Sequence, residues 1–133
     1  MKKHEVKLRV RYAETDQMGV VYHGNYAQYF EIGRVEWLRN QGVSYKSLEE
    51  SAIMLPVVSL SMNYRKPAFY DDELTITTIL KYMGGVKIEF DYEITNQNGE
   101  LLTTANSVLV FVDMKTKRPI SVPQYLDDLI NKE

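Results

Sequence analysis

Residues 25–41 read NYAQYFEIGRVEWLRNQ. The aromatic and small positions of this stretch recur at steps of three and four residues: Tyr26, Tyr29, Phe30, Gly33 and Trp37. That period is typical of an amphipathic helix with one buried face. Asn25 followed by Gln28 predicts a capping box at the N-terminus, and Gly42 predicts a left-handed residue that ends the helix.

The segments on either side of this helix have different periods. Residues 5–12 alternate polar and apolar, which predicts a half-buried strand. Its inward face would be formed by Val6, Leu8, Val10 and Tyr12. After the helix, Ser47 and Glu50 have the spacing of a capping box and predict a second, short helix.

From Met54 onward the period is two almost to the end of the chain. Asn98-Gly99 lies between residues 86–95 and 100–112 and predicts a hairpin with a primed turn. Gly84-Gly85 predicts another hairpin. The last strand, 101–112, is apolar on both faces, so we expect it to be central in the sheet and covered on both sides. The order of elements predicts an α+β fold, with one long helix on a five-stranded antiparallel sheet.

The chain has 133 residues, of which 44% are hydrophobic and 26% charged, as is usual for a globular protein. This length predicts a single domain over residues 1–133. One helix covers only one face of a sheet and leaves its edges open. We therefore expect a partner, in the form of a homodimer or a larger homo-oligomer.

Composition also excludes several classes of function. The net charge is −2 with both signs interspersed, which argues against binding to nucleic acid. There is no cysteine, and the two histidines, His4 and His23, do not form a metal-binding motif, so no metal site is expected. No apolar run is long enough for a membrane span, and we expect a cytoplasmic protein.

The candidate site is the connection ETDQMGVVYHGN, residues 14–25. Asp16 follows a predicted strand and precedes a helix N-terminus, where unpaired backbone N–H groups and the positive end of the helix dipole converge. Gly19 allows a tight turn, after which His23, Gly24 and Asn25 direct their N–H groups towards Asp16. A carboxylate beside such donors suits acyl transfer, because the donors stabilise an oxyanion.

Each of these residues also has a structural interpretation. Asp16 is equally consistent with a cap on the turn that contains Gly19. Histidine at position 23 is more often packed than catalytic. Tyr22 and Tyr26 suit a core as well as an acyl tunnel. Arg65 and Lys66 form a local cationic cluster suited to an anionic ligand, or two solvated charges at a strand end.

Several motifs along the chain together resemble one family. They are Arg11-Tyr12, Thr15-Asp16-x-x-Gly19-Val20-Val21-Tyr22-His23-x-x-Tyr26, Tyr29-Phe30-Glu31, Arg34-x-Glu36, and Tyr64-Arg-Lys-Pro-Ala68 followed by Asp71-Asp72. In this combination the sequence resembles the hotdog-fold acyl-CoA thioesterases of the 4-hydroxybenzoyl-CoA thioesterase and YbgC-like branch. The resemblance covers nearly the full chain.

The resemblance implies a sheet wrapped around one helix, two protomers joined edge to edge, and active sites at their interface. It gives Asp16 the essential carboxylate role, as nucleophile or general base, and makes the His23 N–H the donor to the thioester carbonyl. Tyr22 and Asn25 would lie beside the site. Arg65, Lys66 and Lys87 are candidates for holding the CoA phosphates. CoA would be part of the substrate, with no cofactor required.

Three functions fit this resemblance. The first is hydrolysis of an acyl-CoA or, less favoured, an acyl carrier protein thioester. The second is a non-catalytic acyl-CoA-binding protein that uses the same pocket. The third is a hydratase or dehydratase, but the region around His23 lacks the proline- and glycine-rich helix lead-in of those enzymes. The sequence leaves the acyl group and the choice between dimer and tetramer open.

Overall fold

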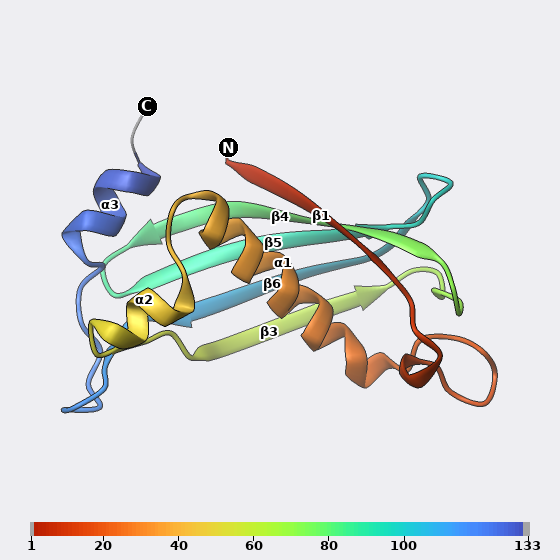
Figure 1. Ribbon diagram of the computed structural model, residues 1–133, viewed down its shortest axis with the longest axis horizontal. Helices are drawn as coiled ribbons and strands as arrows, with labels where there is room; N and C mark the ends of the chain where they lie inside the picture. Colours follow the sequence, from red (N-terminus) through yellow and green to blue (C-terminus); the bar gives the residue numbers. More distant parts are fainter. Residues whose placement is uncertain (1, 132–133) are drawn as a thin grey trace.

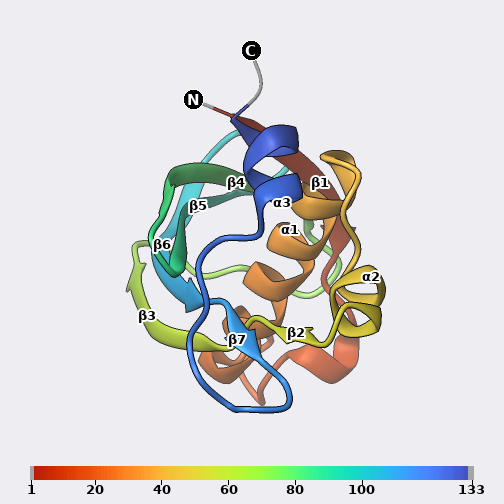
Figure 2. The ribbon, with the colours of Figure 1, turned by 90° about the vertical axis from the view of Figure 1, so that its left-hand side faces the viewer.

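The computed structural model describes residues 2–131, which form a five-stranded antiparallel sheet curved around one long helix (Figures 1 and 2). The strand order is β1-β4-β5-β6-β3, and a small second sheet pairs β2 with β7. The strands are β1 Lys3–Arg9, β2 Ile53–Met54, β3 Val57–Tyr64, β4 Glu73–Gly84, β5 Lys87–Thr95, β6 Leu101–Val110 and β7 Val112–Asp113. The helices are α1 Tyr26–Asn40, α2 Tyr45–Glu50 and α3 Gln124–Ile130, with 3₁₀ turns η1 Tyr12–Glu14 and η2 His23–Asn25. The predicted α+β hotdog architecture is confirmed.

Helix α1 packs its predicted face against the sheet, and every member of that face is buried. The closest approach is at Gly33, where an added Cβ would lie 2.5 Å from Oγ1 of Thr78 and 2.8 Å from Cγ2 of Ile76. Any side chain there would push the helix away from β4. Gly33 therefore fixes the separation between α1 and the sheet.

The predicted helix ends are partly confirmed. Gly42 has a φ of +91°, as expected for a left-handed residue after the C-terminus. The predicted capping box at Asn25 and Gln28 is wrong, because Asn25 has helical φ and ψ and caps nothing with its side chain. In α2 the capping box is formed by Ser44 and Ser47, so the predicted Ser47–Glu50 box is also wrong.

The predicted hairpins are present, although one turn differs. Between β5 and β6 only Gly99, among the loop residues 96–100, has positive φ, so the loop is not the two-residue primed turn predicted for Asn98-Gly99. Asn96 closes it with its side chain, since Oδ1 accepts from the N–H groups of Asn98 and Glu100. An asparagine at the start of a longer loop has replaced the tight turn.

The first strand is shorter than the predicted 5–12 stretch and ends at Arg9. Tyr12 does not lie on its inward face; it starts η1 and is 78% exposed. Helix α3 and the β2–β7 pair were not predicted. Leu126 and Ile130 of α3 are buried and extend the core at the far end of the sheet.

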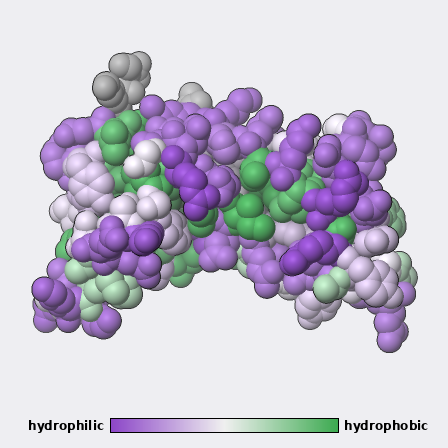
Figure 3. Space-filling model, viewed as in Figure 1, coloured by the Kyte–Doolittle hydropathy of each residue, from purple (hydrophilic) through white to green (hydrophobic). Residues whose placement is uncertain are grey.

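The sheet is unequally covered. Strand β6 is interior in the sheet, as predicted. In a single chain one of its faces is buried, whereas most residues of the other face are only half-buried, so the second face is not covered as expected. Strand β3 forms an edge and seven of its eight residues are exposed. The surface that carries α1 is mainly hydrophilic, with hydrophobic residues showing between polar ones (Figure 3). No helix within residues 2–131 has the length and apolarity needed to cross a membrane.

Candidate active site

An open pocket of about 340 Å³ lies where α1 begins and β3 ends. It is lined by Asp16, Val20, Val21, His23, Tyr26, Tyr64, Arg65, Lys66 and Pro67. The rings of Tyr26 and Tyr64 meet edge to face, with centroids 5.2 Å apart, and form its apolar wall. Five predicted site residues, Asp16, His23, Tyr26, Arg65 and Lys66, therefore come together here from two separate parts of the chain.

Asp16 shapes the turn that carries it. Its Oδ1 accepts the N–H of Met18 at 2.8 Å and, more weakly, that of Val20 at 3.4 Å. Gly19 closes the turn with a φ of +81° and donates its N–H to the Asp16 carbonyl at 3.0 Å. Oδ2 receives no hydrogen bond from residues 2–131. The carboxylate thus caps the turn with one oxygen and leaves the other for the pocket.

The N-terminus of the helix supplies backbone donors. Turn η2 continues directly into α1, so the first helical N–H groups belong to His23 and Gly24. Neither has a hydrogen-bond acceptor among the residues described, whereas the N–H of Asn25 is already paired with the Tyr22 carbonyl at 2.9 Å. The predicted donor at His23 is therefore free, and the predicted donor at Asn25 is not.

The side chains beside these donors differ in their placement. His23 and Tyr22 are exposed, and their rings contact each other with centroids 4.4 Å apart and planes tilted by 39°. The Tyr22 ring lies over Gly24, where a Cβ would approach to 2.6 Å. Asn25, a predicted substrate contact, does not line the pocket; its Nδ2 donates instead to the Glu14 carbonyl at 2.8 Å.

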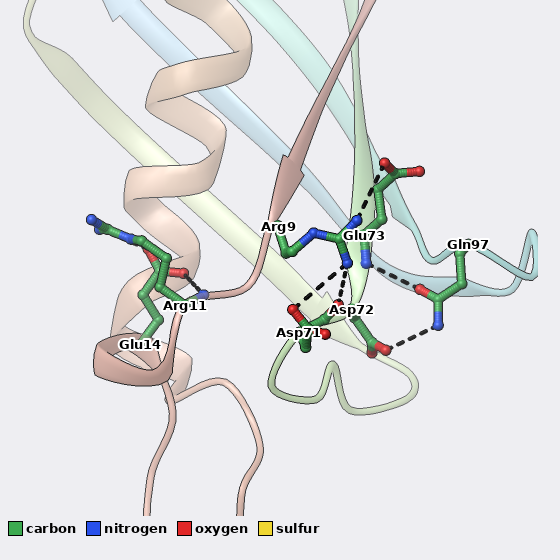
Figure 4. Close-up of polar contacts among 7 residues, drawn as sticks. All are labelled: Arg9, Arg11, Glu14, Asp71, Asp72, Glu73 and Gln97. Carbon is green, nitrogen blue, oxygen red and sulfur yellow. Dashed lines mark hydrogen bonds and ion pairs between the residues drawn. The ribbon is translucent and has the colours of Figure 1, made fainter.

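Glu14 bonds to Arg11 on one side (Figure 4) and to Tyr29 of α1 on the other. Its carboxylate accepts the Arg11 N–H at 2.9 Å and the Tyr29 hydroxyl at 2.8 Å, and it pairs with the Arg11 guanidinium at 3.0 Å. Burial raises the pKa of Glu14, but the hydrogen bonds from Arg11 and Tyr29 and the Arg11 charge outweigh it, so the pKa lies below its ordinary value. The pKa of Tyr29 is raised, mainly by burial and further by its hydrogen bond to Glu14 and the Glu14 charge.

The three predicted cations lie at two ends of the sheet. Arg65 and Lys66 line the pocket, but Lys66 is already paired with Glu100 at 3.1 Å. Arg65 has no ion pair within residues 2–131. Lys87 begins β5 beside Gly84, at the opposite end from the start of α1, and its ammonium lies over the Tyr82 ring. Within one chain Lys87 therefore does not join the other two.

Asp71 and Asp72 shape the loop before β4 (Figure 4). Asp71 has a φ of +71° and contacts Arg9, while Asp72 accepts from the N–H of Phe69 at 2.9 Å and from Gln97 at 3.0 Å. Within residues 2–131 no group of three or more histidine, aspartate or glutamate side chains is arranged to hold a metal ion.

Comparison with known proteins identifies the family. The model of the thioesterase-like superfamily matches residues 10–130. The chain belongs to the thioesterase-like superfamily. This confirms the family resemblance seen in the motifs around Asp16.

Curated relatives of this thioesterase-like protein cover most of its length. It is 36% identical over 122 residues to Bacillus subtilis YneP, provisionally named an acyl-CoA thioesterase, a match that covers 92% of this chain and 88% of the relative. It is 34% identical to the Escherichia coli acyl-CoA thioester hydrolase YbgC, with 88% and 87% covered.

Solved structures show the same fold. A DHNA-CoA thioesterase from Staphylococcus aureus superposes with a TM-score of 0.91 at 38% identity, covering 96% of this chain and 86% of the other. A 4-hydroxybenzoyl-CoA thioesterase variant in complex with its thioester superposes with a TM-score of 0.88 at 22% identity, covering 97% and 99%, and supports the fold alone.

Some pocket residues of this thioesterase-like protein were missed by the sequence analysis. Tyr64, Val20, Val21 and Pro67 were not predicted as site residues, although each adjoins one that was. Glu14 was missed because its partners lie up to 15 positions away and no local spacing marks it.

Proposed function

We propose that this protein hydrolyses an acyl-CoA thioester to a carboxylic acid and free CoA. The observation that carries the proposal is that one pocket contains both the Asp16 carboxylate and the start of α1, where the His23 N–H is unpaired. Membership in the thioesterase-like superfamily and the names of the relatives support the same class of reaction.

The His23 N–H is proposed to bind the carbonyl oxygen of the thioester. Negative charge develops on this oxygen as the carbonyl carbon becomes tetrahedral, and a preorganised backbone donor stabilises that charge. The N-terminal end of α1 adds a favourable dipole. One such donor contributes on the order of 3 kcal/mol to transition-state stabilisation.

Asp16 is proposed to drive the bond-breaking step by one of two routes. As a general base it takes a proton from water, whose oxygen attacks the carbonyl carbon; the C–S bond then breaks, and the proton held by Asp16 passes to the sulfur so that CoA leaves as the thiol. As a nucleophile, it attacks directly, expels CoA and forms an anhydride that water then hydrolyses. Both routes give the same products and need the same free carboxylate oxygen. The exposed His23 side chain would position substrate or water.

The rest of the pocket suits an acyl-CoA. Tyr26 and Tyr64 offer an apolar wall beside Asp16. Arg65 is positioned to bind a phosphate of the nucleotide end, because its charge is not already used. Lys66 is a weaker candidate, since a phosphate would compete with Glu100.

We propose that two chains pair through β3. This edge strand exposes Val57, Val58 and Leu60, and it ends at Tyr64 in the wall of the pocket. An open edge with exposed apolar side chains favours pairing with a second copy. Light scattering that gives only the 15.5 kDa monomer mass at micromolar concentration would contradict this pairing. A dimer or a tetramer of paired chains is expected.

A cytoplasmic location and the absence of a cofactor stay predictions.

The function is tested by measuring the release of free thiol from a panel of short-chain, long-chain and aromatic acyl-CoAs, including 1,4-dihydroxy-2-naphthoyl-CoA. Saturable turnover of at least one thioester is the expected result, and the ratio of kcat to KM ranks the acyl groups. Saturable binding of acyl-CoA by calorimetry, with no thiol released from any of them, would instead support the non-catalytic binding protein.

A further inference from the structure

Glu14 forms two kinds of connection between the Asp16 loop and the helix. Its backbone carbonyl accepts the N–H of Tyr22 at 3.0 Å and Nδ2 of Asn25 at 2.8 Å. Its carboxylate accepts the hydroxyl of Tyr29, one turn into α1, at 2.8 Å. In the described part of the chain, every hydrogen bond that joins residues 11–16 to residues 22–40 ends on Glu14.

The other contacts of the Asp16 loop lead elsewhere. Val21 donates its N–H to the Ala68 carbonyl at 2.8 Å, Tyr70 donates to the Gly19 carbonyl at 3.2 Å, and Val20 pairs with Phe69. These contacts hold the loop to the segment before β4, not to α1. Glu14 is therefore the residue that sets the loop against the start of the helix.

From this geometry, and resting on the function proposed above, we propose that Glu14 is a positioning residue for the thioesterase reaction. Through Tyr22, Asn25 and Tyr29 it fixes the separation between the Asp16 carboxylate and the His23 N–H. Acyl transfer needs both groups at one carbonyl, and a misplacement of about 1 Å can lower a rate by about a hundredfold.

The surroundings of Glu14 suit positioning and not chemistry. Its side chain is only 12% exposed and does not line the pocket. Its carboxylate oxygens accept hydrogen bonds from Arg11 and Tyr29. Arg11 is 75% exposed, so it neutralises the carboxylate from the solvent side without blocking its contact with the helix. Glu14 thus bonds to α1 from a position outside the pocket.

Tyr29→Phe removes only the hydroxyl that Glu14 binds and leaves the buried ring in place. Tyr92→Phe is the matched control. It removes a buried tyrosine hydroxyl that contacts Ser107 at 2.6 Å and also bonds to Arg34 of α1, but lies outside the pocket. Steady-state thiol release gives kcat and KM for both variants. Amide hydrogen exchange of residues 14–25 reports the loop without relying on turnover.

Tyr29→Phe is expected to lower kcat about tenfold or more with KM within about threefold of wild type, and to speed exchange at Tyr22 and Asn25. Tyr92→Phe is expected to change neither. Glu14→Gln keeps an oxygen for Tyr29 and should retain more kcat than Glu14→Ala. Adding Tyr29→Phe to Glu14→Ala should cost little more, because both remove the same bond.

The proposal is overturned if Tyr29→Phe keeps the wild-type kcat and exchange pattern, or if Tyr92→Phe lowers kcat and speeds loop exchange equally. It is also overturned if the loss appears only in KM. Failure of the proposed function gives a different result, namely no thiol release by the wild type. In that case faster exchange of residues 14–25 in Tyr29→Phe but not in Tyr92→Phe would still support Glu14 as the connection, and unchanged exchange would refute it.

Discussion

Oδ1 of Asp16 accepts the N–H of Met18 at 2.8 Å, while Oδ2 receives no hydrogen bond from residues 2–131. The two interpretations of Asp16, a turn cap and a reactive carboxylate, are therefore compatible, because they use different oxygens. The turn fixes the carboxylate in place, and the second oxygen stays available for the proposed reaction. Variants that separate the two oxygens can test each role.

Asp16→Ala and Asp16→Asn should differ in stability. Asparagine keeps a carbonyl oxygen for the Met18 N–H, whereas alanine removes it and should lower the free energy of unfolding by about 1 kcal/mol. Urea unfolding followed by circular dichroism measures the difference. Equal stability of the two variants would show that the bond to Met18 does not hold the turn.

Gly33→Ala should destabilise the protein, because the new methyl group would meet Thr78 and Ile76 well inside contact distance. Overpacking of this kind costs about 1–3 kcal/mol of unfolding free energy. The control is Ile32→Ala, a change at a 40% exposed position on the same helix, which should cost less. A stable Gly33→Ala protein would mean that α1 can move away from β4 freely.

Arg65→Ala should raise KM for the preferred acyl-CoA about three- to fivefold with little change in kcat, as is typical for loss of an exposed charge pair. The effect should shrink at high salt and vanish for an N-acetylcysteamine thioester, which lacks the nucleotide. Lys46→Ala, an exposed change on α2, is the control. An equal rise in KM for the truncated thioester would show that Arg65 does not contact the nucleotide.

Acid should weaken the contribution of Glu14 to stability. Burial raises the pKa of Glu14 in the folded state, but the bonds from Arg11 and Tyr29 outweigh it and lower the pKa overall. The ionised carboxylate therefore stabilises the fold above the unfolded-state pKa. This stabilisation is lost as the pH falls through the folded-state pKa. The difference in unfolding free energy between wild type and Glu14→Gln should therefore be largest near neutral pH and shrink in acid. A difference that grows as the pH falls would contradict the sign.

The sequence predicted the parts of the fold that depend on local pattern. The buried face of α1, the left-handed Gly42 and the positions of both hairpins follow from periodicity and turn residues, although the type of the Asn98-Gly99 turn does not. The cap of α1 was mispredicted because the Asn25 side chain bonds to Glu14, eleven positions away. The cap of α2 was mispredicted because Ser44, not Ser47, is the N-cap residue. Helix α3 was missed because its two buried residues are too few to establish a period.

The site was predicted where one segment carries it and missed where distant segments meet. Asp16 and His23 lie in one connection, so their proximity could be inferred, and both line the pocket, whereas Gly19 closes the turn between them without lining it. Tyr64 reaches the pocket only because β3 runs antiparallel to β6 and ends beside Tyr26, which depends on strand order. Lys87 was grouped with Arg65 by charge alone, and the topology separates them.

The central claim is that the Asp16 carboxylate carries the hydrolysis, and steady-state thiol release by wild type and Asp16→Asn on the preferred acyl-CoA tests it most directly. Circular dichroism first establishes that the variant is folded. We predict that kcat falls by a factor of about 10²–10⁴, because the amide keeps the turn but can neither take a proton nor attack. A folded Asp16→Asn protein with near-wild-type kcat would contradict the account.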